Sequence, residues 1–154
     1  MGLAVDTRGR GFTLLELLIV VAIVGIVAAI AIPALNAAME RSRQKRSMAE
    51  IRALALAVSA YGTDFPFVPR LSGATAEQLA PYLTPTYLKH LPIEDGWRHP
   101  LQYRAQGLDY TILSPGSDGV FTGGLPLGPT TSYADDIILS NGQFVQWPEG
   151  MQVR

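Results

Sequence analysis

The sequence contains one long apolar run, residues 12–32, in which Glu16 is the only ionisable side chain. As an α-helix this run would be about 31 Å long, which matches the hydrocarbon core of a bilayer at about 30 Å. The run is apolar on every face, and a small domain could not cover such a helix as part of its core. Two interpretations remain, a membrane-spanning helix and a secretory signal.

A cleavable secretory signal has some support in the sequence. Arg8 and Arg10 supply a positive start, and Ala-Ile-Ala at residues 29–31 supplies a small-x-small cleavage site. The apolar run is longer than the roughly 7–15 residues usual for such signals, and Glu16 lies near its start. These two features favour a permanent membrane helix.

Flanking charge alone does not orient this helix. Five basic residues follow the run, at positions 41, 43, 45, 46 and 52, and two precede it. A simple positive-inside count would therefore place the C-terminal part in the cytoplasm. The basic cluster begins only eight residues beyond Pro33, inside what is expected to be a continuing helix, so this count does not decide the orientation.

Length, charge and composition limit what the chain outside the apolar run can form and bind. The 154 residues are enough for one domain, and charge is split: residues 1–60 carry seven basic and four acidic groups (+3), residues 61–154 five and nine (−4). The C-terminal part has no basic patch interleaved with aromatic residues, so we expect no nucleic-acid partner. The chain has no cysteine, which excludes disulfides and thiolate zinc sites.

The junction before the apolar run reads Arg10-Gly11-Phe12-Thr13-Leu14-Leu15-Glu16. It closely resembles the class III signal of type IV pilins and of the pseudopilins of type II secretion. The resemblance implies a leader, residues 1–11, that a prepilin peptidase removes between Gly11 and Phe12 on the cytoplasmic side of the membrane. It also implies N-methylation of Phe12, a retained transmembrane helix over residues 12–33 and a periplasmic C-terminal part, opposite to the charge count.

Glu16 would be the fifth residue of the mature chain. A carboxylate in a membrane span costs roughly 2.5–3.5 kcal/mol at the helix centre and less near the interface. In the family that this junction resembles, the carboxylate pairs with the N-terminal ammonium of a neighbouring subunit. In this chain the pair would be Glu16 and the ammonium of Phe12. At about 4 Å this attraction is roughly 4 kcal/mol before desolvation is subtracted. The alternative is that Glu16 only reaches the cytoplasmic headgroups.

Two residues are expected to weaken the apolar helix. Pro33 removes one backbone donor and clashes with the carbonyl of Ala29, which predicts a kink or a local opening. Gly25 is a second weak point. Because related filaments stretch or melt the corresponding region on assembly, we expect residues 25–33 to melt when subunits assemble.

The pattern after the apolar run predicts an α+β fold of the type IV pilin-like kind. Residues 34–62 form an amphipathic continuation of the same helix, which ends near Gly62 and packs on a small domain of residues 63–154. Its apolar stripe comprises Leu35, Met39, Ile51, Leu54, Ala55, Val58 and Tyr61.

Local signals predict the elements of that domain. A capping box at Thr75 opens a short helix through about Leu83. Residues 101–105 and 108–113 predict one hairpin, and residues 137–140 and 143–147 predict a second around Asn141-Gly142.

A second resemblance covers most of residues 12–137. The chain reads YLKHLP at 87–92, DGWRHPLQY at 95–103, DY at 109–110, SPGSDG at 114–119 and ADDI at 134–137. In this order these runs resemble the major pseudopilin of type II secretion. Gly96 stands where proline is usual and Arg98 where glycine is usual, and the chain continues into an extra hairpin, which leaves a minor subunit or a paralogue open.

That resemblance implies a calcium site in the loop of residues 114–136. Calcium prefers six to eight oxygen ligands from carboxylates and carbonyls. Asp118, Asp135 and Asp136 would supply carboxylates, and a carbonyl near Ser114 or Pro115 would complete the shell. Gly119, Gly123 and Gly124 permit the turns. The alternative is an ordinary polar loop.

The sequence does not predict an enzyme. His90 and His99 are the only histidines, and no nucleophile elbow, phosphate loop or metalloprotease helix is present. Trp97, Tyr103 and Tyr110 are expected to anchor the core.

The resemblance therefore predicts a major-pseudopilin-like subunit of a type II secretion system. It would sit in the bacterial inner membrane and polymerise with copies of itself into a periplasmic filament that serves protein export. Its expected partners are the minor pseudopilins, the inner-membrane assembly platform and the prepilin peptidase. Two alternatives stay open: a type IV pilus subunit, and a membrane-anchored periplasmic enzyme or binding module that does not polymerise.

Overall fold

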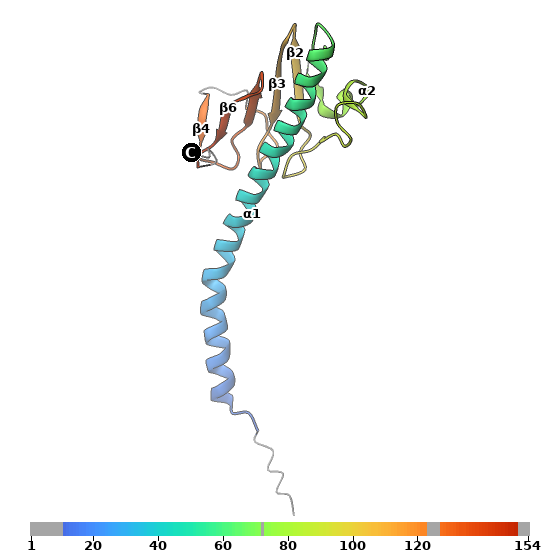
Figure 1. Cartoon of the computed structure of the whole chain (residues 1–154). Helices are drawn as coiled ribbons and strands as arrows, with labels where there is room; N and C mark the ends of the chain where they lie inside the picture. The colour runs from blue at the N-terminus through green and yellow to red at the C-terminus, as the bar shows by residue number, and fades with distance from the viewer. Residues whose placement is uncertain (1–10, 72, 123–126, 151–154) are drawn as a thin grey trace, which may run out of the picture. The chain divides into compact units, whose positions relative to one another are not determined.

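The structure is a computed structural model that describes residues 11–71, 73–122 and 127–150. It divides into two compact units, Met1–Ala38 and Met39–Arg154. The leader predicted for residues 1–11 falls outside the described residues except for Gly11. The helix α1 (Leu14–Asp64) contributes to both units (Figure 1).

α1 is a single helix of 51 residues. The two predicted segments, 12–33 and 34–62, are therefore one continuous element. The helix ends at Asp64, two residues beyond the predicted end at Gly62. The backbone N–H of Phe65, the next residue, still bonds to the carbonyl of Tyr61 at 3.0 Å. The long N-terminal helix and the sheet described below confirm the predicted α+β class.

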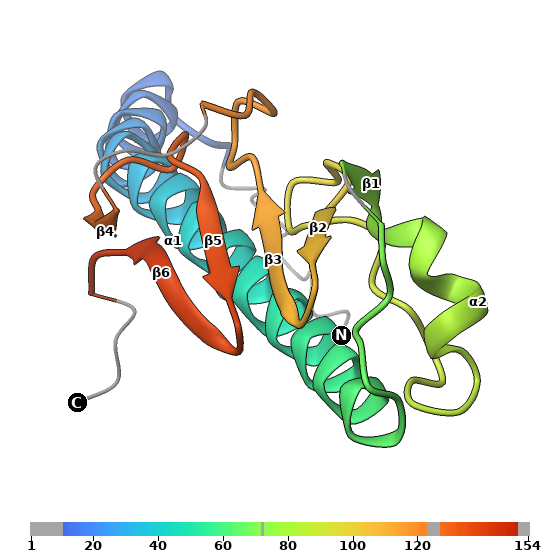
Figure 2. The same cartoon turned by 90° about the horizontal axis from the view of Figure 1, so that it is seen from above.

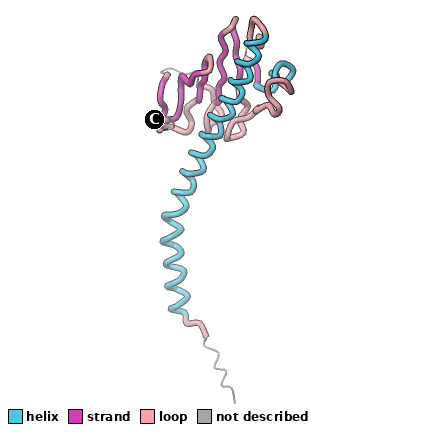
Figure 3. Tube along the Cα trace, viewed as in Figure 1, coloured by secondary structure: helices cyan, strands magenta, loops and turns pink. Residues whose placement is uncertain are grey.

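The second unit contains a six-stranded sheet in the order β1-β2-β3-β5-β6-β4. Strands are magenta in Figure 3. The elements after α1 are β1 (Ala74–Thr75), the 3-10 helix η1 (Ala76–Leu79), α2 (Ala80–Leu83), β2 (Gln102–Gln106), β3 (Asp109–Ser114), β4 (Gly128–Thr130), β5 (Ile137–Ser140) and β6 (Gln143–Pro148). Neighbouring strands are antiparallel except for β4, which pairs with β6 in parallel.

Both predicted hairpins are confirmed. β2 and β3 pair from Gln102 with Leu113 to Gln106 with Asp109. β5 and β6 are joined by Asn141 and Gly142, whose φ angles of 48° and 83° are those of a type I′ turn.

The short helix predicted after Thr75 is confirmed, but the capping box is wrong. Thr75 makes no side-chain cap hydrogen bond. Its position is set by strand pairing instead, because it lies in β1 opposite Gln102 and the next N–H, that of Ala76, bonds to the carbonyl of Leu101 at 2.8 Å.

The core lies between the sheet and the part of α1 that belongs to the second unit (Figure 2). Five of the seven predicted stripe residues are buried there: Ile51, Leu54, Ala55, Val58 and Tyr61. Each fully buried aliphatic side chain contributes about 1.5–3 kcal/mol. They pack with residues from η1, α2, the strands and the segment just before β2: Leu79, Leu83, Leu101, Tyr103, Tyr110, Ile112, Ile137 and Leu139.

The stripe prediction is wrong for Leu35 and Met39, which are 61% and 43% exposed. Burial on α1 begins only at Gln44 and Ser47. Ser47 can be buried because its hydroxyl is satisfied, donating to the carbonyl of Arg43 and accepting from the N–H of Gly96.

Candidate functional site

The start of α1 is closed by reciprocal hydrogen bonds between Thr13 and Glu16. The Thr13 hydroxyl oxygen accepts from the backbone N–H of Glu16 at 3.2 Å. Glu16 Oε2 accepts from the backbone N–H of Thr13 at 3.3 Å and from its hydroxyl at 3.2 Å. This is a capping box, which satisfies backbone donors that the helix itself leaves unpaired.

The capping box is a second role for Glu16 that the sequence analysis missed, although Thr-x-x-Glu at residues 13–16 signals it. It fixes the carboxylate beside the positive end of the helix dipole. While Gly11 is attached, the nitrogen of Phe12 is an uncharged amide. The charge predicted to pair with Glu16 therefore arises only after cleavage between Gly11 and Phe12, and that pairing stays a prediction.

The first unit presents an apolar surface on all sides of α1. Its large side chains from Phe12 to Ile32 are all at least half exposed. The helix is long and apolar enough to cross a membrane, and none of its most apolar 18-residue window is buried in the single chain. The surface needs lipid or other helices to cover it.

The helix does not break at the two predicted weak points. α1 continues through Gly25 and contains Pro33 in its interior. The isolated chain stays helical at Pro33, so the local opening, one of the two expected outcomes, does not occur there. The other outcome, a kink at Pro33, stays a prediction. Melting of residues 25–33 on assembly stays a prediction.

Two of the three aspartates of the predicted calcium loop are bonded near their own position in the chain. Asp118 Oδ1 accepts from the N–H of Val120 at 2.9 Å, and Asp135 Oδ2 accepts from the N–H of Ser132 at 3.1 Å. Both are local bonds typical of polar turns.

Asp136 differs from the other two because it is fully buried. Its Oδ2 accepts from the N–H and the hydroxyl of Thr122, at 3.1 and 2.8 Å. Its Oδ1 is buried without a hydrogen-bond partner among the described residues. An orphaned buried carboxylate oxygen fits a cation ligand, since such an oxygen is otherwise costly.

The structure does not gather the predicted ligands into one cluster. Within the described ranges, no group of three or more His, Cys, Asp or Glu side chains could hold a metal ion. Gly123 and Gly124, part of the predicted loop, lie outside the described residues. Calcium therefore stays a prediction, for which Asp136 gives the best fit.

Ser114 and Pro115, the predicted carbonyl donors, are both buried. The Ser114 hydroxyl donates to Asp95 Oδ2 at 2.7 Å. Asp95, which the sequence analysis did not single out, is fully buried, and its Oδ1 accepts from the N–H groups of Trp97 and His99 at 2.9 and 2.8 Å. This carboxylate therefore ties the 95–99 turn to the end of β3.

His99 also joins these two segments. Its Nδ1 lies 2.8 Å from the carbonyl oxygen of Gly116. Gly116 and Gly119 have φ angles of 70° and 69°, which glycine adopts without strain. A β-carbon on Gly119 would also lie 3.0 Å from the ring of His99. The predicted role of Gly119 as a turn residue is confirmed.

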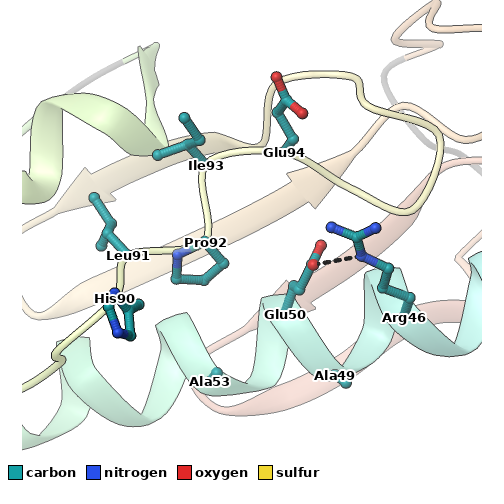
Figure 4. A pocket seen from close by; sticks show the side chains of 9 residues that line it. All are labelled: Arg46, Ala49, Glu50, Ala53, His90, Leu91, Pro92, Ile93 and Glu94. Atoms are coloured by element: carbon teal, nitrogen blue, oxygen red, sulfur yellow. Dashed lines mark hydrogen bonds and ion pairs between the residues drawn. The ribbon is translucent and has the colours of Figure 1, made fainter.

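An open pocket of about 610 Å³ lies between α1 and residues 90–94 (Figure 4). Arg46 Nε donates to Glu50 Oε1 at 2.8 Å across its floor, and this bond raises the pKa of Arg46. The other lining residues are Ala49, Ala53, His90, Leu91, Pro92, Ile93 and Glu94. None of the nine is a serine, threonine or cysteine that could act as a nucleophile.

An apolar helix with a carboxylate in its capped first turn, continuing into a helix packed on a small antiparallel sheet, defines a membrane-anchored subunit with the type IV pilin-like fold. Comparison with known proteins identifies the family within this class. The family model "Prokaryotic N-terminal methylation motif" matches residues 7–32, and "Type II secretion system (T2SS), protein G" matches residues 34–125. The chain belongs to the type II secretion system protein G family.

Curated relatives agree with this assignment. Type II secretion system core protein G of Klebsiella pneumoniae is 32% identical over 93% of this chain and 97% of its own length. The protein of the same name from Vibrio cholerae serotype O1 is 34% identical over 75% of this chain and 80% of its own length. The protein of the same name from Escherichia coli K12 is 31% identical over 74% of this chain and 78% of its own length. No solved structure matches the chain.

These matches confirm the resemblance to the major pseudopilin. They favour a secretion subunit over the two alternatives, the pilus subunit and the non-polymerising periplasmic protein. The family is one of structural subunits.

Proposed function

We propose that this chain is matured and assembled as a pseudopilin that serves protein export. The prepilin peptidase cleaves between Gly11 and Phe12 and methylates the amine of Phe12. The mature chain sits in the inner membrane with its C-terminal domain in the periplasm. The match of the methylation motif to residues 7–32 supports this maturation.

The proposed assembly reaction exchanges lipid contacts of α1 for contacts with other copies of α1. The observation that carries it is the apolar surface of the first unit, which the chain does not cover itself. Van der Waals packing between such helices is their main source of association in a membrane. Glu16 adds specificity, because an unpaired carboxylate penalises any register that leaves it without the ammonium of Phe12.

The partners follow from this role. The filament consists of copies of this chain, with minor pseudopilins and the inner-membrane assembly platform as further partners. Membership of the secretion family supports assembly with other components of that system.

Two variants separate the capping role of Glu16 from its role between subunits. Glu16→Gln keeps a side chain that can close the capping box, since glutamine serves at this position, but removes the charge. Thr13→Ala removes both capping-box bonds made by the hydroxyl, keeps the backbone N–H of residue 13 that donates to Glu16 Oε2, and leaves the carboxylate. We expect Glu16→Gln to abolish filament formation and export of a secreted reporter, and Thr13→Ala to retain both.

Membrane levels of each variant, measured by immunoblot, control for stability. Equal loss in both variants would show that Glu16 acts only within its own chain. Mass spectrometry of the membrane-extracted protein should give a chain that begins at methylated Phe12. A chain beginning at Ile32 would identify residues 1–31 as a secretory signal and overturn the proposal.

We also propose calcium for the loop of residues 114–136. Asp136 would be a ligand through its orphaned Oδ1, with Asp118 and Asp135 as further carboxylates and the carbonyls of Ser114 or Pro115 completing the shell. The bound ion would neutralise the buried carboxylate and hold the loop. We expect calcium to raise the melting temperature of the detergent-solubilised chain, and Asp136→Asn to abolish that shift while Glu77→Gln retains it. An equal shift in the Asp136→Asn variant would exclude this site.

A further inference from the structure

A second cavity, of about 460 Å³, shares Arg46 with the pocket of Figure 4. One side comes from α1 and the other from the turn that follows Asp95. Its lining residues are Ser42, Arg43, Arg46, Gly96, Trp97 and Arg98. Half of them are arginines, and we call this cavity the arginine pocket.

The two sides of the arginine pocket are held together by side-chain hydrogen bonds. The indole N–H of Trp97 donates to Glu40 Oε2 at 2.7 Å, and the backbone N–H of Gly96 donates to the Ser47 hydroxyl at 2.8 Å. Asp95 fixes the turn from within through the N–H of Trp97. The pocket is therefore preorganised, which lowers the entropy cost of binding a ligand.

Arg98 occupies a backbone conformation that disfavours it. Its φ angle is 71°, in the left-handed region where residues other than glycine are uncommon. Strained residues of this kind cluster at functional sites. The strained residue of this turn is therefore also the third arginine of the pocket.

The arginines keep donors for a ligand. Arg43 Nη1 donates to Glu40 Oε1 at 2.7 Å and Arg46 Nε donates to Glu50 Oε1 at 2.8 Å. Each guanidinium has five N–H donors, so most remain available. Figure 4 marks only the Nε of Arg46 as bonded to Glu50, and no bond to its two terminal nitrogens is drawn. The side chains of Arg43 and Arg46 are 47% and 61% exposed, which leaves them accessible.

We propose that the arginine pocket binds a phosphate group. Planar guanidinium forks match the tetrahedral oxygens of phosphate and bind them through paired hydrogen bonds. Glu40 pairs with Arg43 and Glu50 pairs with Arg46, and Glu94 and Asp95 also act on Arg46 from further away. Arg98 forms no ion pair with another described residue, so its guanidinium is the one that an anion would engage. Two sources supply this chemistry, the headgroup of an anionic phospholipid and inorganic phosphate. The pocket begins at Ser42, ten residues after the apolar run, so the membrane that holds the chain is itself a source.

The first arm of the test uses inorganic phosphate and the full chain in a neutral detergent and a phosphate-free buffer. A Trp147→Phe background leaves Trp97, which lines the pocket, as the only tryptophan. Phosphate should shift the fluorescence of Trp97 with saturation. Arg98→Gly removes the guanidinium and also relieves the backbone strain, so we expect this variant to stay folded.

We expect Arg98→Gly to weaken phosphate binding by about tenfold or more, since a paired guanidinium contact is lost. The matched control is Lys45→Ala, which removes one exposed charge from α1 outside the pocket. It should change binding by less than about twofold, because its charge is screened by solvent and salt.

The second arm reconstitutes the same chains in vesicles of phosphatidylcholine, with or without phosphatidylglycerol. A change in Trp97 fluorescence that requires phosphatidylglycerol and is lost in Arg98→Gly identifies the lipid headgroup as the source. Binding of free phosphate with no response to phosphatidylglycerol identifies a soluble phosphate site. Both results support the pocket. No response in either arm overturns the proposal. The proposal is also overturned if Arg98→Gly loses filament assembly while the natural chain binds no phosphate. The pocket would then accept only acidic side chains of a second copy.

Discussion

Tyr103 and Tyr110 lie on adjacent strands with their ring centroids 6.4 Å apart, yet their hydroxyls have opposite environments. The Tyr110 hydroxyl lies 2.8 Å from the Ser59 hydroxyl and donates to the carbonyl of Ala55 at 3.1 Å. The Tyr103 hydroxyl is buried with no partner among the described residues. Burial raises the pKa of Tyr103, because the phenolate would be poorly solvated there.

This difference predicts opposite effects for the same substitution. Tyr110→Phe removes hydrogen bonds that join β3 to α1 and should destabilise the fold by about 1 kcal/mol. Tyr103→Phe removes an unsatisfied polar atom and should be neutral or stabilising by up to about 1 kcal/mol. Near-ultraviolet circular dichroism of the detergent-solubilised chain during thermal unfolding measures both. Equal losses of stability in the two variants would mean that the hydroxyl of Tyr103 has a partner after all.

Gly96 lies where the 95–99 turn meets α1. A β-carbon at this position would overlap the carbonyl oxygen of Arg43 and its neighbouring backbone atoms. Backbone of a helix cannot move aside cheaply, so Gly96→Ala should cost about 1–3 kcal/mol and lower the melting temperature.

The control for that prediction is a glycine with space around it. A β-carbon on Gly62 would meet only Val68 Cγ1, at an ordinary 3.5 Å. Gly62→Ala should therefore be neutral or stabilising by up to about 1 kcal/mol, because alanine is the better helix former. A Gly96→Ala variant as stable as Gly62→Ala would contradict the close approach of the turn to the helix.

The turn between β5 and β6 depends on both the backbone and the side chain of Asn141. Asn141 Oδ1 accepts from the N–H of Tyr110 at 2.9 Å, and Nδ2 donates to Asp109 Oδ1 at 2.8 Å. Asn141→Gly keeps the left-handed backbone and loses these bonds, while Asn141→Ala loses both. We expect losses of about 1 kcal/mol for glycine and about 2–3 kcal/mol for alanine. If alanine is tolerated better than glycine, the left-handed backbone of Asn141 is not what limits the stability of this turn.

Local chemistry made part of this fold predictable. Asn141-Gly142 specifies its turn through two left-handed residues. The composition of residues 12–32 predicts an apolar helix, and the spacing of Ile51, Leu54 and Val58 predicts the buried face of α1. In each case the signal lies within a few residues of the structure that it specifies.

Elements whose stability comes from distant partners were not predictable. β1 has two residues and β4 three, and they exist because they pair with Gln102–Gln106 and Gln143–Pro148. Gln44 and Ser47 are polar and were not part of the predicted apolar stripe, although both are buried. Only the turn that packs on Ser47 explains its burial.

The candidate site divides in the same way. The position of Glu16 was evident from its offset to Gly11, and its capping partner Thr13 was within reach of a local pattern. The role of Asp95 could not be found from a local pattern, because its three hydrogen-bond donors come from two segments of the chain. The aspartates predicted to share a cation, at positions 118, 135 and 136, are separated by a loop whose conformation a sequence pattern does not determine.

Tyr87 provides a pH-dependent contribution to stability. Its hydroxyl donates to Asp64 Oδ2 at 2.6 Å, and this hydrogen bond raises the pKa of Tyr87 to about 12. The folded chain thus holds a proton that the unfolded chain releases near the ordinary value of 10.0. The resulting stabilisation is fully present below pH 10 and is lost as the pH rises toward 12.

We therefore expect the stability difference between the natural chain and Tyr87→Phe to be largest below pH 10 and to shrink between pH 10 and 12. Denaturant unfolding of both proteins across this range measures it, and the subtraction cancels the titration of the other tyrosines. Asp64→Asn should return the ultraviolet absorbance titration of Tyr87 toward the ordinary value, since the negative acceptor is gone. Tyr82→Phe leaves the Asp64 hydrogen bond intact and is the control. A difference between natural chain and Tyr87→Phe that stays constant over the range would show that Asp64 does not hold the proton of Tyr87.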